Sequence, residues 1–445
     1  MISLLFALVC GFAALVHSMK VQRVTLLDWA LLAIGGLYGI GWVLVLHVTA
    51  AGGNPGWAQW ILPFQDYYLV HNLSAFLLLG GIFIGWYLVP PIWRVKFLPN
   101  TDIAVRRPDR WPRVLWALLI LAVTLQGVYT HSYGGFLGVL EYSALIRSGL
   151  FNAVPPNPFS FLRPFGGLAM IAALGFFGLL LSRNRSLSVR LGFVLSFLFS
   201  LYILYSWLGR MAFMVFLVSF PLTLAMYRSS SPFWLMAKGG LAFIGTLVGA
   251  YGMSVLLNLK PAENLLEFLA KELSYPFASF FAQLAYGEHL FRGFVDFLWA
   301  PVFLLPSSWW THWLEPVGQV NTAVIMGAPK GERGVTGTIP VDLLTLGLMQ
   351  LHIPGIILTG ALFGALLRIV QAFLDRISCR GVRVAFEANL ALQLAVLGAF
   401  YSEPELIISR NIRWIAAALI AFVLLRLPNL RVRLLPRHAH RGVVS

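Results

Sequence analysis

The segment Ala328–Gly347, with the sequence APKGERGVTGTIPVDLLTLG, places two cations and a carboxylate among regularly spaced glycines. Three glycines follow Lys330 at every third residue, and glycine permits close backbone approach. Backbone N–H groups in such a loop can hold an anion, and Lys330 and Arg333 bring positive charge to the same place. We therefore predict that this loop holds an anionic group, with the carboxylate of Glu332 beside it.

A helix is expected to follow this loop. Pro340 suits the first turn of a helix, and Asp342 comes next, where the helix dipole favours a carboxylate. Asp342 therefore has a structural explanation as well as a chemical one. The glycine pattern by itself is weak support for an anion site, because it is not a Walker loop and lacks a preceding strand.

The composition of the whole chain decides which elements position this loop. Of its 445 residues 59% are hydrophobic and 11% are charged, whereas soluble domains have about 45–50% apolar and about 25% charged residues. Such a chain is an integral membrane protein with helical spans of about 20 residues. We predict one all-α transmembrane domain over residues 1–445, with about eleven spans and twelve or more as the alternative. The spans are expected near 2–17, 26–48, 67–91, 114–130, 164–182, 191–207, 211–227, 239–258, 343–367, 384–401 and 411–425.

The charges of the predicted loops set the orientation. Loops on one side carry 22 of the 32 basic residues but only 5 of the 17 acidic ones. The positive-inside rule makes that side cytoplasmic, so the N-terminus is expected outside and the C-terminus inside. Because this distribution accounts for the net charge of +15, no nucleic-acid partner is expected.

Cations on the outer side are not explained by that rule, and arginine is well suited to a two-pronged grip on phosphate. Arg210 lies between two spans with almost no loop, so it either snorkels to the interface or contacts a phosphate. Arg147 and Arg163 likewise have two readings, as interface anchors or as phosphate ligands. The outer cations are Arg147, Arg163, Arg210, Lys260, Lys271, Arg292, Lys330, Arg333, Arg410 and Arg413.

Three outer segments are long enough to build a structure of their own, namely 50–66, the first functional outer loop at 131–163 and the large loop at 259–342. In the large loop Glu263, Glu267 and Lys271 are spaced as one polar helical stripe, which predicts an amphipathic helix on the leaflet or against the bundle. The tryptophans of the same loop suit a membrane interface. Alternatively, they form a wall that faces lipid or sugar.

No metal site and no cofactor are predicted. The outer histidines do not pair with a second ligand at helical spacing, and a nucleophile elbow is absent from the sequence. The two cysteines, Cys10 and Cys379, are expected near opposite membrane faces and offer no disulfide framework.

Three stretches resemble the O-antigen polymerase (Wzy) family of bacterial oligosaccharide repeat-unit polymerases. GVLEYSALIRSGL resembles the arginine-bearing first outer loop, and LGRMAFMV is similar to a short Gly/Ser-Arg motif at a span edge. GVTGTIPVDLLTLGLMQLHIPGIILTG resembles the segment that closes the large loop and enters the next span. The general layout of spans and loops is similar over most of the chain.

The resemblance implies a metal-independent glycosyltransferase of the glycosyltransferase C-like fold in the bacterial inner membrane. Such enzymes join repeat units carried on undecaprenyl pyrophosphate into O-antigen or exopolysaccharide at the periplasmic face. The partners implied are the lipid-linked oligosaccharide, membrane lipids and a chain-length-regulating co-polymerase. The expected orientation, with a periplasmic N-terminus and a cytoplasmic C-terminus, fits this location.

Roles for individual residues follow from that chemistry. Cations should stabilise the departing pyrophosphate, and a carboxylate should take the proton of the acceptor hydroxyl. Glu332 is the base to test first, with Asp342, Glu272 and Glu141 as alternatives. The expected catalytic residues are Arg333, Arg210, Glu332 and Asp342, and the expected substrate-binding residues are Arg147, Arg163, Lys330, Arg292, Lys271, Tyr275, Trp309 and Trp310.

Two rivals remain open at this point. An O-antigen ligase performs the same chemistry with lipid A core as the acceptor, and the sequence separates the two poorly. A lipid-linked oligosaccharide flippase or other transporter belongs to a different class, which needs charges inside the spans and commonly shows two similar halves. Charges within the predicted spans are scarce and no internal repeat is evident, so the transferase reading is preferred.

Overall fold

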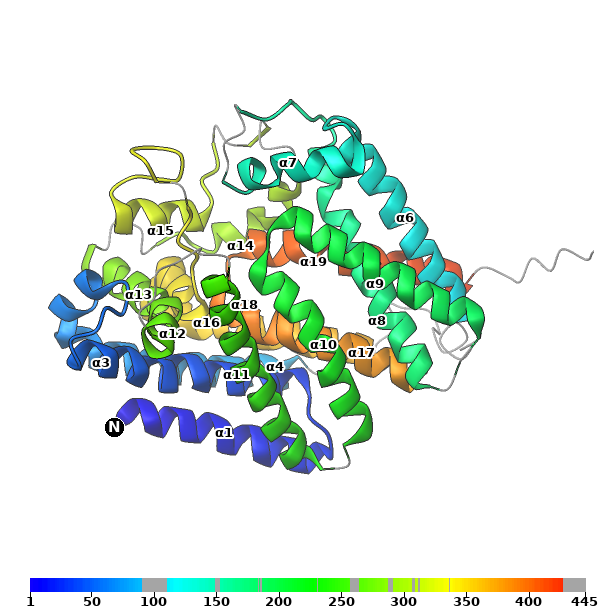
Figure 1. Cartoon of the computed structure of the whole chain (residues 1–445). Helices are drawn as coiled ribbons and strands as arrows, with labels where there is room; N and C mark the ends of the chain where they lie inside the picture. The colour runs from blue at the N-terminus through cyan, green and yellow to red at the C-terminus, as the bar shows by residue number, and fades with distance from the viewer. Residues whose placement is uncertain are drawn as a thin grey trace, which may run out of the picture.

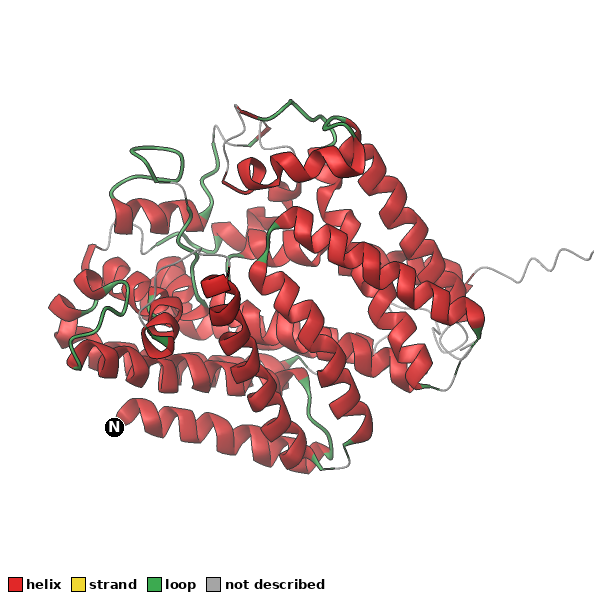
Figure 2. Cartoon of the chain, in the orientation of Figure 1, coloured by secondary structure: helices red, strands yellow, loops and turns green. Residues whose placement is uncertain are grey.

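The computed structural model describes residues 1–89, 110–148, 153–182, 184, 186–229, 231–256, 264–286, 291–305, 309–310, 313–335 and 337–426. Every regular element in this described part is a helix (Figure 1, Figure 2). Ten helical segments of the same part are long and apolar enough to cross a membrane. The protein is therefore a multi-pass membrane protein built as a helical bundle.

The bundle consists of long helices and of the short helical pieces that continue them along the chain. Separate short helices cover one end of the bundle. The bundle contains α1 (Ile2–Val21), α2 (Leu26–Ile34), the π-helical η1 (Gly35–Gly41), α3 (Trp42–Ala50), α4 (Tyr68–Leu88), α6 (Trp111–His131), α8 (Leu168–Leu181), α9 (Leu187–Trp207), α10 (Arg210–Arg228), α11 (Pro232–Leu256), α16 (Leu343–Leu374), α17 (Arg380–Leu390), the π-helical η10 (Ala391–Val396), α18 (Leu397–Phe400) and α19 (Pro404–Arg426). The shorter helices include α7 (Gly135–Ser148), η7 (Ser160–Gly167), α12 (Leu265–Leu273), α13 (Tyr275–Tyr286), α14 (Val295–Trp299), η8 (Ala300–Leu304) and α15 (Val317–Met326).

Ten of the eleven predicted spans coincide with the ten membrane-length segments of the described residues. The remaining one, at 239–258, falls on α11, whose last predicted residues lie outside the described part. That span is not among the ten, so it stays a prediction. The agreement follows from the physics of lipid, where a helix satisfies its own backbone and only needs a long apolar surface.

Helices α4 and α16 pack backbone against backbone. A Cβ added to Gly81 or Gly85 of α4 would lie 2.2 Å or 1.9 Å from a carbonyl oxygen of α16. Gly360 and Gly364 of α16 meet carbonyl oxygens of α4 at 2.6 Å and 2.2 Å in the same way. Both helices thus present glycines four residues apart, which is the spacing that lets two membrane helices approach closely.

Helix α16 is interrupted near its start. Leu351 and His352 have non-helical backbone angles, and His352 has a φ of 55°. A Cβ on Gly355 would lie 2.2 Å from the carbonyl oxygen of Gly347, so the chain folds back on itself at the break. The predicted span at 343–367 is therefore present but is not one continuous helix.

The first piece of α16, residues 343–350, is buried in protein on all sides. Its last carbonyl groups accept hydrogen bonds from the loop before α14, where the N–H groups of Arg292 and Gly293 donate to Met349 and Gln350 at 3.1 Å and 3.0 Å. Interrupted backbone at membrane depth is tolerated where protein supplies such partners. The break thereby anchors the large loop to the bundle.

Three helices of the large loop, α12, α13 and α15, lie on the same side of the molecule as the N-terminus (Figure 1). Asn321 of α15 donates to the hydroxyl of Ser279 on α13 at 3.1 Å and accepts from Gln283 at the same distance. Glu267 of α12 accepts from the N–H of Asn54 after α3 at 3.2 Å. The described part of the loop is therefore folded against the bundle; Glu263, the first member of the predicted polar stripe, lies outside the described residues.

Candidate functional site

A cavity of about 1320 Å³ lies where α12, α13 and α15 meet the ends of α8, α10 and α19. Segments far apart in the sequence contribute to its wall, from Trp57 in the loop after α3 to Trp414 of α19. Its lining contains six cations and three carboxylates among the described residues. The charged lining residues are Arg147, Arg163, Lys271, Glu272, Lys330, Glu403, Glu405, Arg410 and Arg413.

Arg413 of α19 is half-buried and brings a positive charge to the lining of this cavity. Its Nη2 donates to Oε1 of Gln393 at 2.8 Å, and its Nη1 lies 3.3 Å from the sulfur of Met170. The guanidinium carbon is 5.7 Å from the centre of the Trp207 ring. Among the described residues no carboxylate pairs with Arg413. A charge at membrane depth without a counter-ion is costly, so the arrangement suits an anionic ligand.

The π-helical segment η10 supplies the amide that holds this arginine. Gln393 lies in η10, and its Nε2 donates to the carbonyl oxygen of Arg410 and to Oδ1 of Asn411, each at 3.2 Å. One side chain therefore fixes both the arginine-bearing turn of α19 and the guanidinium of Arg413. Single π-helical turns are frequent at functional sites because they re-aim a side chain without ending the helix.

Arg410 stands one helical turn before Arg413 and faces an aromatic wall. Its guanidinium lies 4.8 Å from the centre of the Tyr401 ring, and this ring stacks on Tyr275 with centroids 6.0 Å apart. The Tyr275 hydroxyl donates to the carbonyl oxygen of Phe400. Burial, followed by the neighbouring Tyr401, raises the pKa of Tyr275 well above its ordinary value, so this phenol stays neutral.

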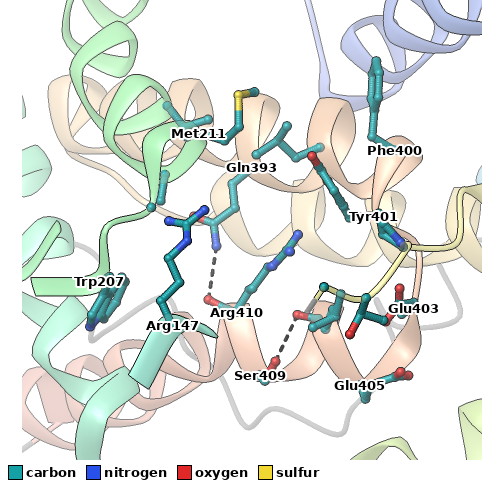
Figure 3. A pocket seen from close by; sticks show the side chains of 18 of the residues that line it. Arg147, Trp207, Met211, Gln393, Phe400, Tyr401, Glu403, Glu405, Ser409 and Arg410 are labelled. Carbon is teal, nitrogen blue, oxygen red and sulfur yellow. Dashed lines mark hydrogen bonds between the residues drawn. The ribbon is translucent and has the colours of Figure 1, made fainter. Parts of the chain in front are cut away.

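Two carboxylates, Glu403 and Glu405, line the cavity at the start of α19. Figure 3 shows Glu403 and Glu405 on one side of the view and Arg147 on the other, with Arg410 between them. Oε1 of Glu403 accepts from the N–H of Val341 at 3.0 Å. Burial raises the pKa of Glu403 to about 7. One cavity thus combines a cationic region with a carboxylate that can exchange a proton near neutral pH.

The glycine-rich loop around Gly331 was predicted to hold an anion with its backbone N–H groups, and the structure shows these groups engaged elsewhere. The N–H groups of Lys330 and Gly331 donate to Oε1 of Gln319 and to the carbonyl oxygen of Val335, at 3.0 Å and 2.8 Å. Those of Glu332 and Val335 also donate within the loop. These amides form a hydrogen-bonded turn and do not offer a cradle to an anion. Lys330 still lines the cavity, whereas Glu332 and Arg333 are exposed and lie outside its lining.

Asp342, the other predicted catalytic carboxylate, caps helix α16. It is fully buried, accepts from the N–H groups of Leu344 and Thr345 at 3.1 Å and 3.4 Å, and accepts from the Tyr38 hydroxyl at 2.6 Å. Burial is the main reason that the pKa of Asp342 is raised to about 6. Its neighbours give it the structural role of an N-cap, and it does not line the cavity.

The remaining predicted residues divide into two groups. Arg292 makes a two-pronged ion pair with Asp296, with both distances 2.7 Å, and Trp309 is 66% exposed; neither lines the cavity. Arg210 begins α10 between two lining residues, but its side chain lies outside the described part. The predicted residues that do line the cavity are Arg147, Arg163, Lys271, Lys330, Tyr275 and Trp310.

Several lining residues were not selected from the sequence as site residues. Arg410 and Arg413 were noted only as outer cations, and Gln393 and Glu403 were not considered. A usable signal is the stretch SEPELIISRNIR at 402–413. It begins an otherwise apolar span with two acidic residues, followed by two arginines one helical turn apart. Charges grouped in this way at a membrane edge are more than one anchor requires.

Comparisons with known proteins do not assign this chain to a family. No protein-family model, curated protein or solved structure matches this chain. Within the described residues no group of three or more His, Cys, Asp or Glu side chains is arranged to hold a metal ion. The assignment of a function therefore depends on the geometry of the cavity.

Proposed function

We propose that this chain is a glycosyltransferase that joins oligosaccharide repeat units carried on a lipid pyrophosphate, as a polymerase of surface polysaccharide. One observation carries the proposal, namely that cations from separate parts of the chain line a single large cavity at one end of a membrane bundle. A soluble anion would not require a membrane protein of this size. An anion attached to a lipid would meet such a cavity at the membrane surface.

The cations suit a diphosphate that carries developing negative charge. Arg413 has no carboxylate partner among the described residues. Arg410 beside it stands over the ring of Tyr401, and its backbone carbonyl oxygen accepts a hydrogen bond from Gln393. Arg147 and Arg163 lie on the same cavity wall. Guanidinium groups fixed where charge appears during bond cleavage stabilise the leaving group more than the bound donor, which accelerates transfer.

The rest of the lining suits sugars. A volume of about 1320 Å³ exceeds the ordinary range of about 300–1,000 Å³ for small-molecule pockets, which favours an oligosaccharide as ligand. Flat aromatic side chains can stack on sugar rings. The aromatic lining residues are Trp57, Trp207, Phe216, Phe268, Tyr275, Phe303, Trp310, Phe400, Tyr401 and Trp414.

The location follows from the charge distribution of the loops. The cavity is bordered by the segments that the positive-inside rule places outside, including the large loop and the turn between η10 and α19. We therefore place the site at the periplasmic face of a bacterial inner membrane, with the C-terminus in the cytoplasm. A glycosyltransferase C-like fold remains part of this proposal.

The proposal can be tested with the full chain in lipid nanodiscs, supplied with an undecaprenyl-pyrophosphate-linked repeat unit. A polymerase produces a ladder of lengthened lipid-linked chains. A ligase adds material only when lipid A core is supplied, and a flippase moves the lipid across a vesicle without any covalent product. The absence of new glycosidic bonds with either acceptor would refute the proposed chemistry.

Arg413→Lys tests the role of the cations. Lysine keeps the charge but cannot grip with two nitrogens, so we expect at least about tenfold weaker binding of inorganic pyrophosphate and slower ladder formation. Arg190→Lys on the exposed surface of α9 is a matched control that should behave like the parent chain. Unchanged pyrophosphate affinity in the Arg413 variant would remove the main support for a diphosphate site.

A further inference from the structure

Among the described residues, no cation forms an ion pair with the carboxyl groups of Glu403 and Glu405 at one end of the cavity. Their side chains are 4% and 7% exposed, and both line the cavity. Within the described part of the chain, neither oxygen of Glu405 accepts a hydrogen bond. A buried carboxylate without any partner is unfavourable, so this end of the cavity is arranged for something other than two resident anions.

The charges that face this pair are already engaged. Arg292 binds Asp296 through two nitrogens, and Gln350 donates to Asp296 at 2.8 Å. Arg410 stands over the ring of Tyr401 and attracts Glu403 only at longer range. Because two neighbouring buried carboxyls cannot both ionise at low cost, one of the pair holds a proton.

The surroundings decide which carboxyl holds it. Glu403 accepts the Val341 N–H through Oε1 and is favoured by Arg410, so the negative charge is better placed on Glu403. Glu405 has no such donor and, when protonated, can donate to Glu403. With Oε1 engaged by Val341, Oε2 of Glu403 is left for a ligand in the cavity.

On the basis of the proposed function, we infer that Glu403 is the general base for the acceptor sugar, and that Glu405 is its neutral hydrogen-bond donor. The acceptor hydroxyl gives its proton to Oε2 of Glu403 while its oxygen bonds to the anomeric carbon of the donor. The bond from that carbon to the pyrophosphate oxygen breaks, and the electron pair leaves on the pyrophosphate beside the arginines. The proton on Glu403 then passes to solvent.

The packing around Glu403 holds its carboxylate in a fixed position, as a general base requires. A Cβ on Gly318 of α15 would lie 2.7 Å from both carboxylate oxygens, so only glycine leaves room for them. The backbone of Ser402 donates to the carbonyl oxygen of Val341 at 2.8 Å, which fixes the segment that carries Glu403. A pKa of about 7, raised by burial, is close to the value at which a general base works best near neutral pH.

Other carboxylates are less suitable as the base. Glu332 and Asp342 both lie outside the lining, and Oδ2 of Asp342 caps α16. Glu272 lines the cavity but is only half-buried. Glu272→Gln therefore belongs in the test as the competing assignment.

The test uses the full chain in nanodiscs and measures transfer rates, their pH dependence and the binding of inorganic pyrophosphate. For Glu403→Gln we expect transfer to fall at least about 100-fold, with pyrophosphate affinity within about twofold of the parent. Asp66→Asn, on the exposed turn before α4, is the matched control and should leave both unchanged. Glu405→Gln keeps a hydrogen-bond donor, so the pH dependence of the transfer rate should stay as in the parent. Glu405→Met loses the donor, so the fall in rate on the acid side (the acid limb) should begin at higher pH.

Each outcome decides a separate point. If Glu403→Gln transfers within about threefold of the parent, or if Glu272→Gln or Glu405→Gln is the inactive variant, Glu403 is not the base although the glycosyltransferase assignment stands. An acid limb that stays in place in Glu405→Met overturns the hydrogen-bonded pair, and it does so even if the Glu403 variant fails to fold. If the parent chain forms no glycosidic bond, the proposed function fails and this inference fails with it.

Discussion

The glycine interface between α4 and α16 gives the sharpest prediction about stability. Gly85→Ala adds one methyl group at a point where a Cβ would lie 1.9 Å from the carbonyl oxygen of Ala361. Ordinary contact begins near 3.4 Å, so the two helices must separate by about 1.5 Å. The obstructing atom belongs to the backbone and cannot rotate away, as the end of a side chain could.

The expected loss follows from two opposing effects. Overpacking of this kind costs about 1–3 kcal/mol, and the upper end applies because separation also loosens the contacts of Gly81 and Gly364. The gain in helix propensity from glycine to alanine returns up to about 1 kcal/mol. We therefore expect Gly85→Ala to lower the free energy of unfolding by about 2 kcal/mol.

Gly80→Ala is the matched control, because Gly80 lies on the same helix and a Cβ there meets nothing within 4 Å. That variant should be as stable as the parent or up to about 1 kcal/mol more stable. Unfolding in mixed micelles of dodecylmaltoside and increasing dodecyl sulfate, followed by tryptophan fluorescence, compares the two. Equal midpoints for both variants would refute the reasoning that backbone contact holds α4 and α16 together.

Three further predictions concern the site and its supports. Gly318→Ala should displace the carboxylate of Glu403 and slow transfer at least about tenfold while pyrophosphate affinity stays constant; a normal rate would show that the carboxylate is not fixed by this contact. Because the folded state raises the pKa of Asp342 to about 6, it binds more protons than the unfolded chain, so stability should fall as the pH rises from 4 to 7. Asp342→Asn should flatten this slope in unfolding midpoints, and an equal slope would contradict the assignment. Asn321→Ala should leave partners on α13 unpaired, cost about 1–3 kcal/mol and speed proteolysis of the large loop relative to the parent.

Most of the bundle could be predicted from the sequence because the backbone hydrogen bonds of a membrane helix join residues that are close in the sequence. Each hydrogen bond of a span closes within the span, so a run of apolar residues such as Leu187–Trp207 is sufficient to specify it. The break in α16 at Leu351–His352 was not predicted, since Pro354 is tolerated in continuous membrane helices as well. The contact of Gly347 with Gly355 and the donors from the loop before α14, which stabilise the interruption, are tertiary contacts.

The site was predicted less completely, and the glycine-rich loop explains why. Whether the amides around Gly331 are free for an anion depends on which other segment takes their hydrogen bonds, and here Gln319 and Val335 take them. The sequence by itself determined that this is a multi-pass helical membrane protein, because composition alone fixes what lipid will accept. Tertiary structure decided that Arg413 donates to Gln393 and pairs with no carboxylate of the described residues, and that Glu403 and Glu405 are buried together. Those facts depend on distances between side chains far apart in the sequence, and no local pattern encodes them.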